Sequence, residues 1–75
     1  MTPDRPAKRS LTLRGHRTSV TLETAFWQAL KTLAQSEGRS VNALAAEIDA
    51  ARAPETGLAS AIRVHLLAAA RAGRL

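Results

Sequence analysis

Apolar and polar positions alternate with a period of two along residues 17–22. This pattern predicts a β-strand that leads directly into a helix. Its two faces differ: one carries Thr18, Val20 and Leu22, and the other carries Arg17, Ser19 and Thr21. A lone strand ahead of a helical chain would leave its backbone N–H and C=O groups unpaired. We therefore expect it to pair with the same strand of a second copy.

A shorter alternation precedes this strand and is out of step with it. Its apolar residues Leu11 and Leu13 occupy odd positions, whereas those of residues 17–22 occupy even ones. Two structures explain the break. A two-residue hairpin turn at Gly15 and His16 would bring both apolar sets onto one side. Alternatively, Gly15 is a flexible bend after an unpaired arm, and the sequence favours neither structure strongly.

From Glu23 onward the apolar spacing changes to about 3.6 residues, the period of an α-helix. Gly38 and Pro54 interrupt it, because glycine favours a helix C-terminus and the residue before proline leaves the helical region. Ser40 is the expected N-cap of the second helix. The predicted helices span residues 24–37, 41–52 and 58–72.

The 75 residues form one domain at most and include no cysteine, so neither a disulfide nor a thiolate metal site stabilises a core of this size. Dimerisation is the remaining route. We expect a flexible basic arm at residues 1–9 and a single domain at residues 10–75. The dimer core is predicted to contain Val20, Leu22, Phe26, Trp27, Leu30, Leu33, Leu44 and Ile48.

Basic residues are concentrated at the start of the chain. The net charge is +5, and residues 1–17 hold five of the 11 Lys and Arg residues against one acidic residue. A basic segment beside a nearly neutral body is typical of nucleic-acid binding, although basic termini also serve solubility.

The polar strand face is the strongest candidate site. Arginine can donate two hydrogen bonds to guanine, hydroxyls can reach base edges, and a two-stranded ribbon fits the major groove. We predict base contacts from Arg17, Ser19 and Thr21. A second candidate is the start of the second helix, whose free N–H groups and positive dipole end favour phosphate. The predicted phosphate contacts are Lys8, Arg9, Arg14, Arg39, Ser40, Val41 and Asn42.

Other functional classes have little support. His16 and His65 are isolated, and no nucleophile or carboxylate is placed beside either, so we expect neither catalysis nor a metal or other cofactor. No small-molecule ligand is evident. The longest apolar run, Leu66 to Ala70, is far short of a membrane span, and no apolar signal segment is visible. We expect a cytoplasmic protein.

The segments Val20-Thr21-Leu22 and Gly38-Arg39-Ser40, each followed by a predicted helix, resemble the ribbon-helix-helix repressors. The stretch Lys8-Arg9-Ser10-Leu11-Thr12-Leu13-Arg14-Gly15-His16-Arg17-Thr18-Ser19-Val20-Thr21-Leu22-Glu23 resembles a short bacterial subgroup. The resemblance implies a mostly α fold with one N-terminal strand. It also implies an intertwined homodimer, whose intermolecular two-stranded antiparallel ribbon enters the major groove. The third helix is additional to the general fold.

The leading hypothesis is a dimeric repressor that binds double-stranded DNA, and the alternative is an antitoxin-type module that neutralises a partner protein. The third helix is the candidate surface for that partner or for a higher oligomer. A hairpin in each subunit would give a four-stranded sheet, too wide for the groove. DNA reading therefore predicts that the segment before Gly15 leaves the ribbon. Membrane binding through the third helix should be feeble, because its stripe is mostly alanine.

Overall fold

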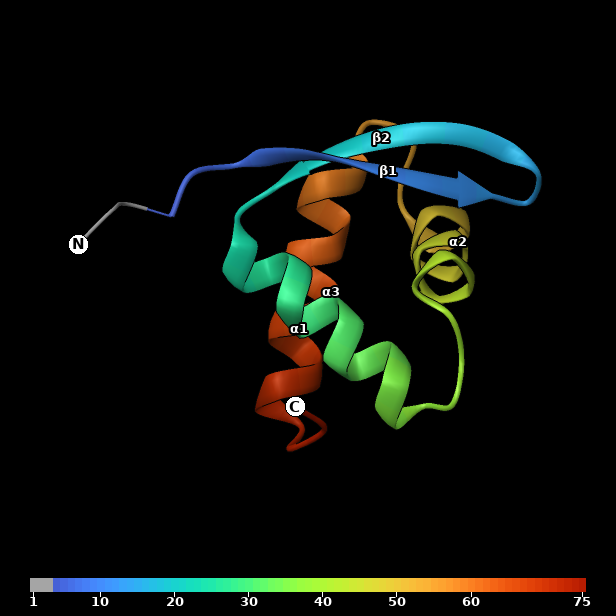
Figure 1. The fold of residues 1–75 in the computed structure, drawn as a ribbon. Coiled ribbons are helices and arrows are strands. Elements are labelled where there is room, and N and C mark those ends of the chain that lie inside the picture. The colour runs from blue at the N-terminus through green and yellow to red at the C-terminus, as the bar shows by residue number, and fades with distance from the viewer. Residues whose placement is uncertain (1–3) are drawn as a thin grey trace.

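The computed structural model describes residues 4–75. An antiparallel hairpin lies across a group of three helices (Figure 1). Its strands are β1 (Ala7–Leu13) and β2 (His16–Leu22), and the helices are α1 (Thr24–Ser36), α2 (Val41–Ala51) and α3 (Leu58–Arg71). Each helix ends within one residue of its expected range. The described helices include none that is long and apolar enough to cross a membrane.

The strand that we expected to be single has a partner within its own chain. β1 pairs with β2 so that Leu11 lies opposite Thr18 and Leu13 lies opposite His16. The hairpin alternative is therefore the one that the structure adopts, but its turn is formed by Arg14 and Gly15, one residue earlier than we expected. Both turn residues have positive φ, 51° and 83°, as a two-residue type I′ turn requires.

This turn removes the mismatch between the two apolar patterns. It pairs odd positions of β1 with even positions of β2, and directly opposed residues of an antiparallel pair share a face. The side chains of Leu11, Leu13, Val20 and Leu22 therefore meet on the side of the helices, where all four are buried. Because the apolar residues change from odd positions in β1 to even positions in β2, a two-residue turn brings both sets onto one face.

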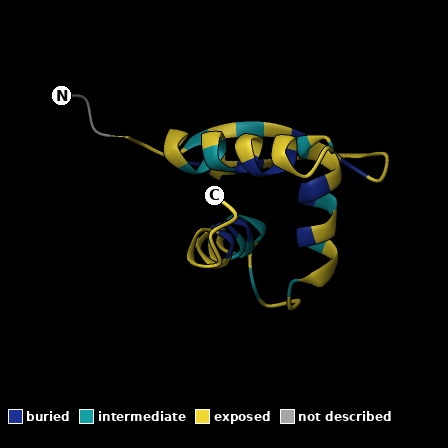
Figure 2. Ribbon diagram, turned by 90° about the horizontal axis from the view of Figure 1, so that it is seen from below, coloured by how far each residue is buried: buried dark blue, intermediate teal, exposed yellow. Residues whose placement is uncertain are grey.

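The core closes within one chain. Six of the residues expected in a dimer core are buried without a partner: Val20, Leu22, Leu30, Leu33, Leu44 and Ile48. Phe26 and Trp27 are partly buried against them. Buried faces of the hairpin and the helices point toward one another (Figure 2), and among residues 4–75 no polar or charged residue is buried. The homodimer stays a prediction, but core formation no longer requires it.

The segment expected to be a flexible arm also differs from the prediction. Residues 1–3 lie outside the described residues, but Ala7, Lys8 and Arg9 belong to β1. Ahead of them, the Asp4 carboxylate accepts hydrogen bonds from the backbone N–H groups of Thr24 and Ala25 at 2.8 and 2.9 Å. The described part of this segment, residues 4–9, is thus held to the hairpin and to the start of α1.

Candidate nucleic-acid interface

The face of the hairpin that points away from the helices is polar along both strands. We call it the outer hairpin face and define it by Lys8, Ser10 and Thr12 of β1 together with Arg17, Ser19 and Thr21 of β2. All six residues are exposed. The register sets them in three rows: Lys8 opposite Thr21, Ser10 opposite Ser19, and Thr12 opposite Arg17. No helix covers this side of the hairpin (Figure 1).

The structure brings the three predicted base-contacting residues, Arg17, Ser19 and Thr21, onto this face together. Alternate residues of a strand are about 6.8 Å apart, so the three side chains form a regular row. Among the described residues, none of the three makes a side-chain hydrogen bond within the chain. Their donors and acceptors are available to a ligand.

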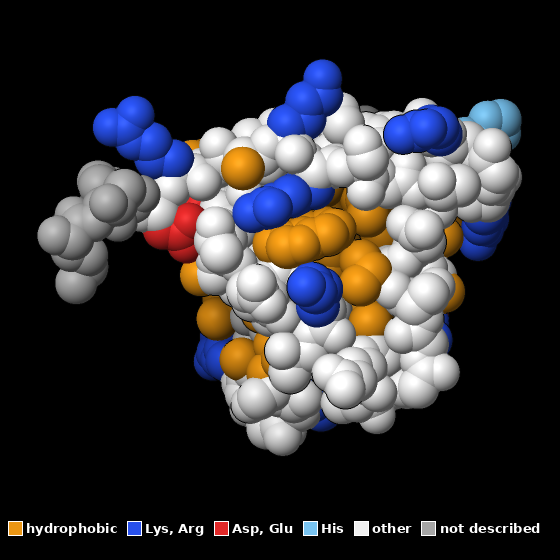
Figure 3. All heavy atoms as spheres, viewed as in Figure 1, with side chains coloured by type: hydrophobic (Ala, Val, Ile, Leu, Met, Phe, Trp, Pro, Cys, Tyr) orange, Lys and Arg blue, Asp and Glu red, His pale blue; other side chains and the backbone are white. Residues whose placement is uncertain are grey.

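The outer hairpin face has a positive charge that no neighbouring acid neutralises. The sequence contains no Asp or Glu between Asp4 and Glu23. Within residues 4–75, no carboxylate lies within ion-pair distance of Lys8, Arg14 or Arg17. Lys and Arg side chains project along the hairpin in Figure 3, and the carboxylate atoms visible there lie near its N-terminal end.

Acidic side chains are paired elsewhere on the molecule. Glu23 accepts from Arg63 at 2.7 Å, and this hydrogen bond lowers the pKa of the Glu23 carboxyl. Asp49 accepts from Arg52, also at 2.7 Å. Both carboxylates are therefore compensated by arginine, whereas the positive charge on the outer hairpin face is not compensated and suits a polyanion.

Arg9, a predicted phosphate contact, lies on the other face of the hairpin. Its guanidinium carbon lies 5.6 Å from the centre of the Trp27 ring, and its Nη2 is 3.4 Å from Thr24 Oγ1. Odd positions of β1 face the helices, so the strand geometry that exposes Lys8 turns Arg9 inward. Arg9 thus serves to fasten β1 to α1. Lys8 and Arg14 remain exposed.

The second predicted phosphate site, at the start of α2, is largely engaged within the chain. Arg39 donates to both carboxylate oxygens of Glu47 at 3.1 and 2.8 Å, and also to Glu37 at 2.9 Å. Ser40 Oγ accepts from the N–H of Ala43 at 3.0 Å, as an N-cap does. The Arg39 charge is therefore compensated within the chain, and a phosphate contact at this helix start stays a prediction.

Asn42 in that first turn has a structural partner on the hairpin. Its Oδ1 accepts a hydrogen bond of 3.0 Å from the backbone N–H of Thr12. This N–H must therefore point away from β2, so Asn42 covers part of the open edge of β1. The contact places Asn42 at the edge of β1, whereas Val41 beside it packs against the core.

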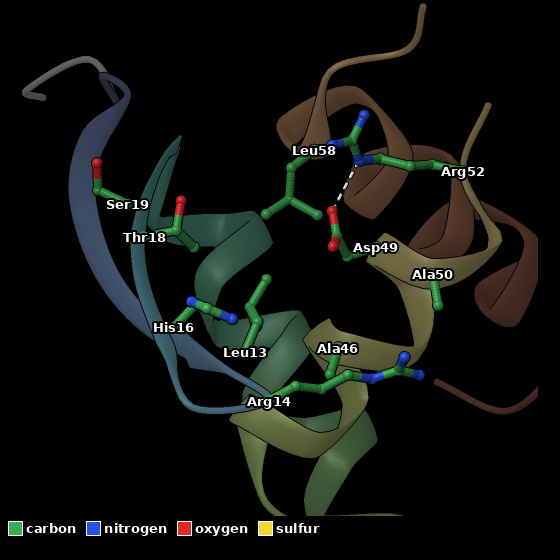
Figure 4. A pocket seen from close by; sticks show the side chains of 10 residues that line it. All are labelled: Leu13, Arg14, His16, Thr18, Ser19, Ala46, Asp49, Ala50, Arg52 and Leu58. Atoms are coloured by element: carbon green, nitrogen blue, oxygen red, sulfur yellow. Dashed lines mark hydrogen bonds and ion pairs between the residues drawn. The ribbon is translucent and has the colours of Figure 1, made fainter. Parts of the chain in front are cut away.

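A hollow of about 370 Å³ lies beneath the turn end of the hairpin (Figure 4). Leu13 and His16 face Ala46 across it, and the ion pair between Asp49 and Arg52 lies on its far wall. The acid in this wall is thus already neutralised. The described residues contain no group of three or more His, Asp or Glu side chains that could hold a metal ion.

Ser10 and Thr12 are the residues of this surface that sequence reasoning did not select. Their position follows only from the hairpin register, which sets Ser10 opposite Ser19 and Thr12 opposite Arg17. The signal that could have identified them is the dipeptide Arg14-Gly15. Glycine suits the second central position of a type I′ turn, and a turn at this dipeptide fixes the register.

Comparison with known protein families accounts for this arrangement. A family model described as ribbon-helix-helix domain matches residues 6–70. The chain belongs to the ribbon-helix-helix family. The predicted family is therefore confirmed, and so is a ribbon-helix-helix fold with an additional C-terminal helix, although the two-stranded antiparallel sheet is formed within the chain. Searches of curated proteins and of solved structures found no significant match.

Membership also sets the general function. The ribbon-helix-helix domain is a regulatory fold that binds DNA or acts in antitoxin-type regulators, and it is not an enzyme family. In this ribbon-helix-helix protein, the exposed polar and basic surface of the hairpin is the part of the molecule whose chemistry matches DNA.

Proposed function

We propose that this ribbon-helix-helix protein is a cytoplasmic transcriptional repressor that binds double-stranded DNA sequence-specifically as a homodimer. The observation that carries the proposal is the outer hairpin face, where basic and hydroxyl side chains have no partner within the described chain. A β-ribbon can enter the major groove and read base edges there. Repression would follow if the bound protein occupies DNA that the transcription machinery needs.

Base and phosphate contacts would come from adjoining parts of the surface. Arg17 is suited to guanine, because its guanidinium can donate to O6 and N7 together. Ser19 and Thr21 supply short hydroxyls that either donate or accept. Lys8 and Arg14, at the two ends of the hairpin, would contact phosphates, and so would the first-turn N–H groups of α2.

Selection of bound sequences from random double-stranded DNA tests this proposal. A repressor dimer should enrich a motif with two-fold symmetry, since operator symmetry mirrors protein symmetry. Arg17→Ala should relax the preference at one position in each half-site and weaken binding to the best sequence by about fivefold or more. Lys31→Ala on α1 removes one charge away from the hairpin and serves as the control. Failure to enrich any motif would exclude sequence-specific binding.

A second candidate function is binding to a partner protein, as in antitoxins. Large exposed hydrophobic residues of the described chain are concentrated near its C-terminus: Val64 is 67% exposed, Leu67 is 58% exposed and Leu75 is 43% exposed. All three line one apolar groove of about 400 Å³, which α3 forms with Phe26 and neighbouring residues of α1. Such a groove is typical of interaction surfaces.

The two functions can be separated with one pair of variants. Leu67→Ser should abolish co-purification with the product of an adjacent gene if that product is the partner, and should leave DNA binding intact. Arg17→Ala should do the reverse. Light scattering of both variants shows whether the groove instead holds a second copy of the chain, in which case Leu67→Ser alone lowers the mass.

A further inference from the structure

We infer that the exposed face of α3 is a docking surface for an amphipathic helix of another protein, and that this helix carries an acidic side chain beside its apolar anchors. This inference rests on the second candidate function, binding to a partner protein, and gives that partner its chemistry. A second copy of the chain does not fit the same surface.

Val64 forms a ridge between two grooves on this face. On one side of it lies the groove of about 400 Å³ between α3 and α1, which contains Leu67. On the other side lies a groove of about 390 Å³ between α3 and α2, where Ala51 and Ala61 contribute apolar surface. Val64 lines both grooves. A helix laid along such a surface can place anchors three and four residues apart into the hollows.

The docking surface is separate from the outer hairpin face. Of the described residues that line the two grooves, none belongs to β1 or β2. In Figure 1, α3 begins near the hairpin and runs away from it. A partner helix could therefore stay bound while the hairpin contacts DNA.

A second copy of the chain offers no apolar anchor from elsewhere on its surface. The large exposed hydrophobic residues of the described chain are Val64, Leu67 and Leu75, and all three line the groove between α3 and α1. Two copies could therefore bring such residues together only by packing one α3 against the other, in an isologous contact.

The charge of α3 opposes that contact. Arg63 and Arg71 lie one turn before and one turn after Leu67 on the helix surface, and α3 contains no Asp or Glu. Two α3 helices packed around Leu67 would therefore bring arginines together without a carboxylate between them. Like charges set against each other at an interface suppress association.

Other parts of a second copy could supply little negative charge. The chain has 6 acidic residues, and all but Glu55 are engaged within residues 4–75. The engaged residues are Asp4 at the start of α1, and Glu23, Glu37, Glu47 and Asp49 with arginines.

Arg71 is the charge that a partner helix can satisfy. Within residues 4–75, no carboxylate lies within ion-pair distance of Arg71, whereas Arg63 is held by Glu23 at 2.7 Å. Arg71 is exposed and lies one turn beyond Leu67. Interfaces commonly combine an apolar centre with a polar rim, and charge pairs at the rim mainly give specificity. The partner should therefore carry Asp or Glu where it passes Arg71.

Anisotropy titration of the full chain with labelled model helices tests this inference. The first probe is a peptide of about 20 residues, long enough to be helical, with Leu at every third or fourth position, Glu beside the Leu stripe and Ala elsewhere. In two matched peptides, Gln or Lys replaces Glu. We expect the Glu peptide to bind about three- to fivefold more tightly than the other two, and added salt should reduce this advantage.

Two variants assign the binding to the surface. Arg71→Glu should reverse the order of the Glu and Lys peptides, whereas Lys31→Glu makes the same charge change at an exposed position outside both grooves and should preserve the order. Leu67→Ser should weaken all three peptides by about tenfold, and Ala43→Ser, also exposed and outside both grooves, should not. Circular dichroism verifies folding, and Arg71→Gln, which should abolish the preference, replaces Arg71→Glu if that variant unfolds.

The outcomes separate the inference from the function on which it rests. Equal binding of the three peptides, tighter binding of the Lys peptide, or no binding at all would overturn the inference, even if a natural partner co-purified through Leu67. A particle mass that falls on Leu67→Ser in light scattering would also overturn it, because the surface would then hold a second copy. The expected order of the peptides would support it even if the product of an adjacent gene failed to co-purify, since that failure rejects only one candidate partner.

Discussion

The carboxylate of Asp4 accepts a hydrogen bond of 2.8 Å from the backbone N–H of Thr24, 20 residues later in the chain. Its other oxygen accepts from Ala25 at 2.9 Å. Glu23 is the N-cap residue of α1 but makes no side-chain capping bond, so Asp4 supplies the cap from outside the helix. A carboxylate is well suited to this position, because the N-terminus of a helix is the positive end of its dipole.

Replacement of Asp4 by Asn should lower the melting temperature, and the loss should depend on pH. The two backbone hydrogen bonds lower the pKa of the Asp4 carboxyl in the folded state. Its contribution is therefore complete above the unfolded pKa, near 3.8, and disappears as the pH falls through the folded pKa. Thermal melts of wild type and Asp4→Asn from pH 7 to acid pH should converge at the acid end. Glu55→Gln, at an exposed position, is the control, and a constant difference across the range would contradict the capping role.

Truncation of Leu11 tests whether β1 belongs to the core. Leu11 is 3% exposed, so Leu11→Ala should reduce the free energy of unfolding by about 2–5 kcal/mol, as expected for a buried leucine. Leu67→Ala is the matched control, since Leu67 is 58% exposed and its loss should cost less than about 0.5 kcal/mol. Urea titration measures both. Equal, small effects would show that β1 is an unpaired arm in solution.

Arg9 should act on stability and not on DNA recognition. Its guanidinium lies over the ring of Trp27, the single tryptophan of the chain. Arg9→Ala should cost about 0.5–2 kcal/mol, because this cation–π contact is partly buried, and should change the Trp27 emission spectrum. The salt dependence of DNA binding should stay at its wild-type slope, whereas Lys8→Ala should reduce it by about one unit. A reduced slope for Arg9→Ala would restore its predicted role as a phosphate contact.

The turn residues should respond in opposite directions to substitution. Gly15 has a φ of 83°, and the left-handed region costs a residue with a Cβ atom about 1–2 kcal/mol. Gly15→Ala should therefore destabilise the hairpin by about that amount. Arg14 also has positive φ, 51°, but Asn tolerates this conformation better than Arg, so Arg14→Asn should be neutral or stabilising. Chemical unfolding of the two variants measures the difference, and destabilisation of equal size by both would argue against a type I′ turn.

Local patterns in the sequence predicted much of the helical part of the molecule. The helix boundaries depend on apolar spacing, on Ser40, and on the breaks at Gly38 and Pro54, all of which act within a few residues. The exposure of Arg17, Ser19 and Thr21 was likewise visible, because a strand places alternate residues on opposite faces whatever it pairs with.

Tertiary structure decided which groups these local elements meet. The sequence left hairpin and arm as alternatives, and the structure chose the hairpin because burial of Leu11 and Leu13 requires the register that a turn at Arg14 and Gly15 provides. That register also brought Ser10 and Thr12 onto the candidate surface. The sequence shows no partner for Arg9 or Arg39, and we therefore predicted both as phosphate contacts. The structure places Trp27 beside Arg9 and Glu47 beside Arg39. Periodicity determines the face on which a residue lies, but its partners depend on segments that are distant in sequence and meet only when the core forms.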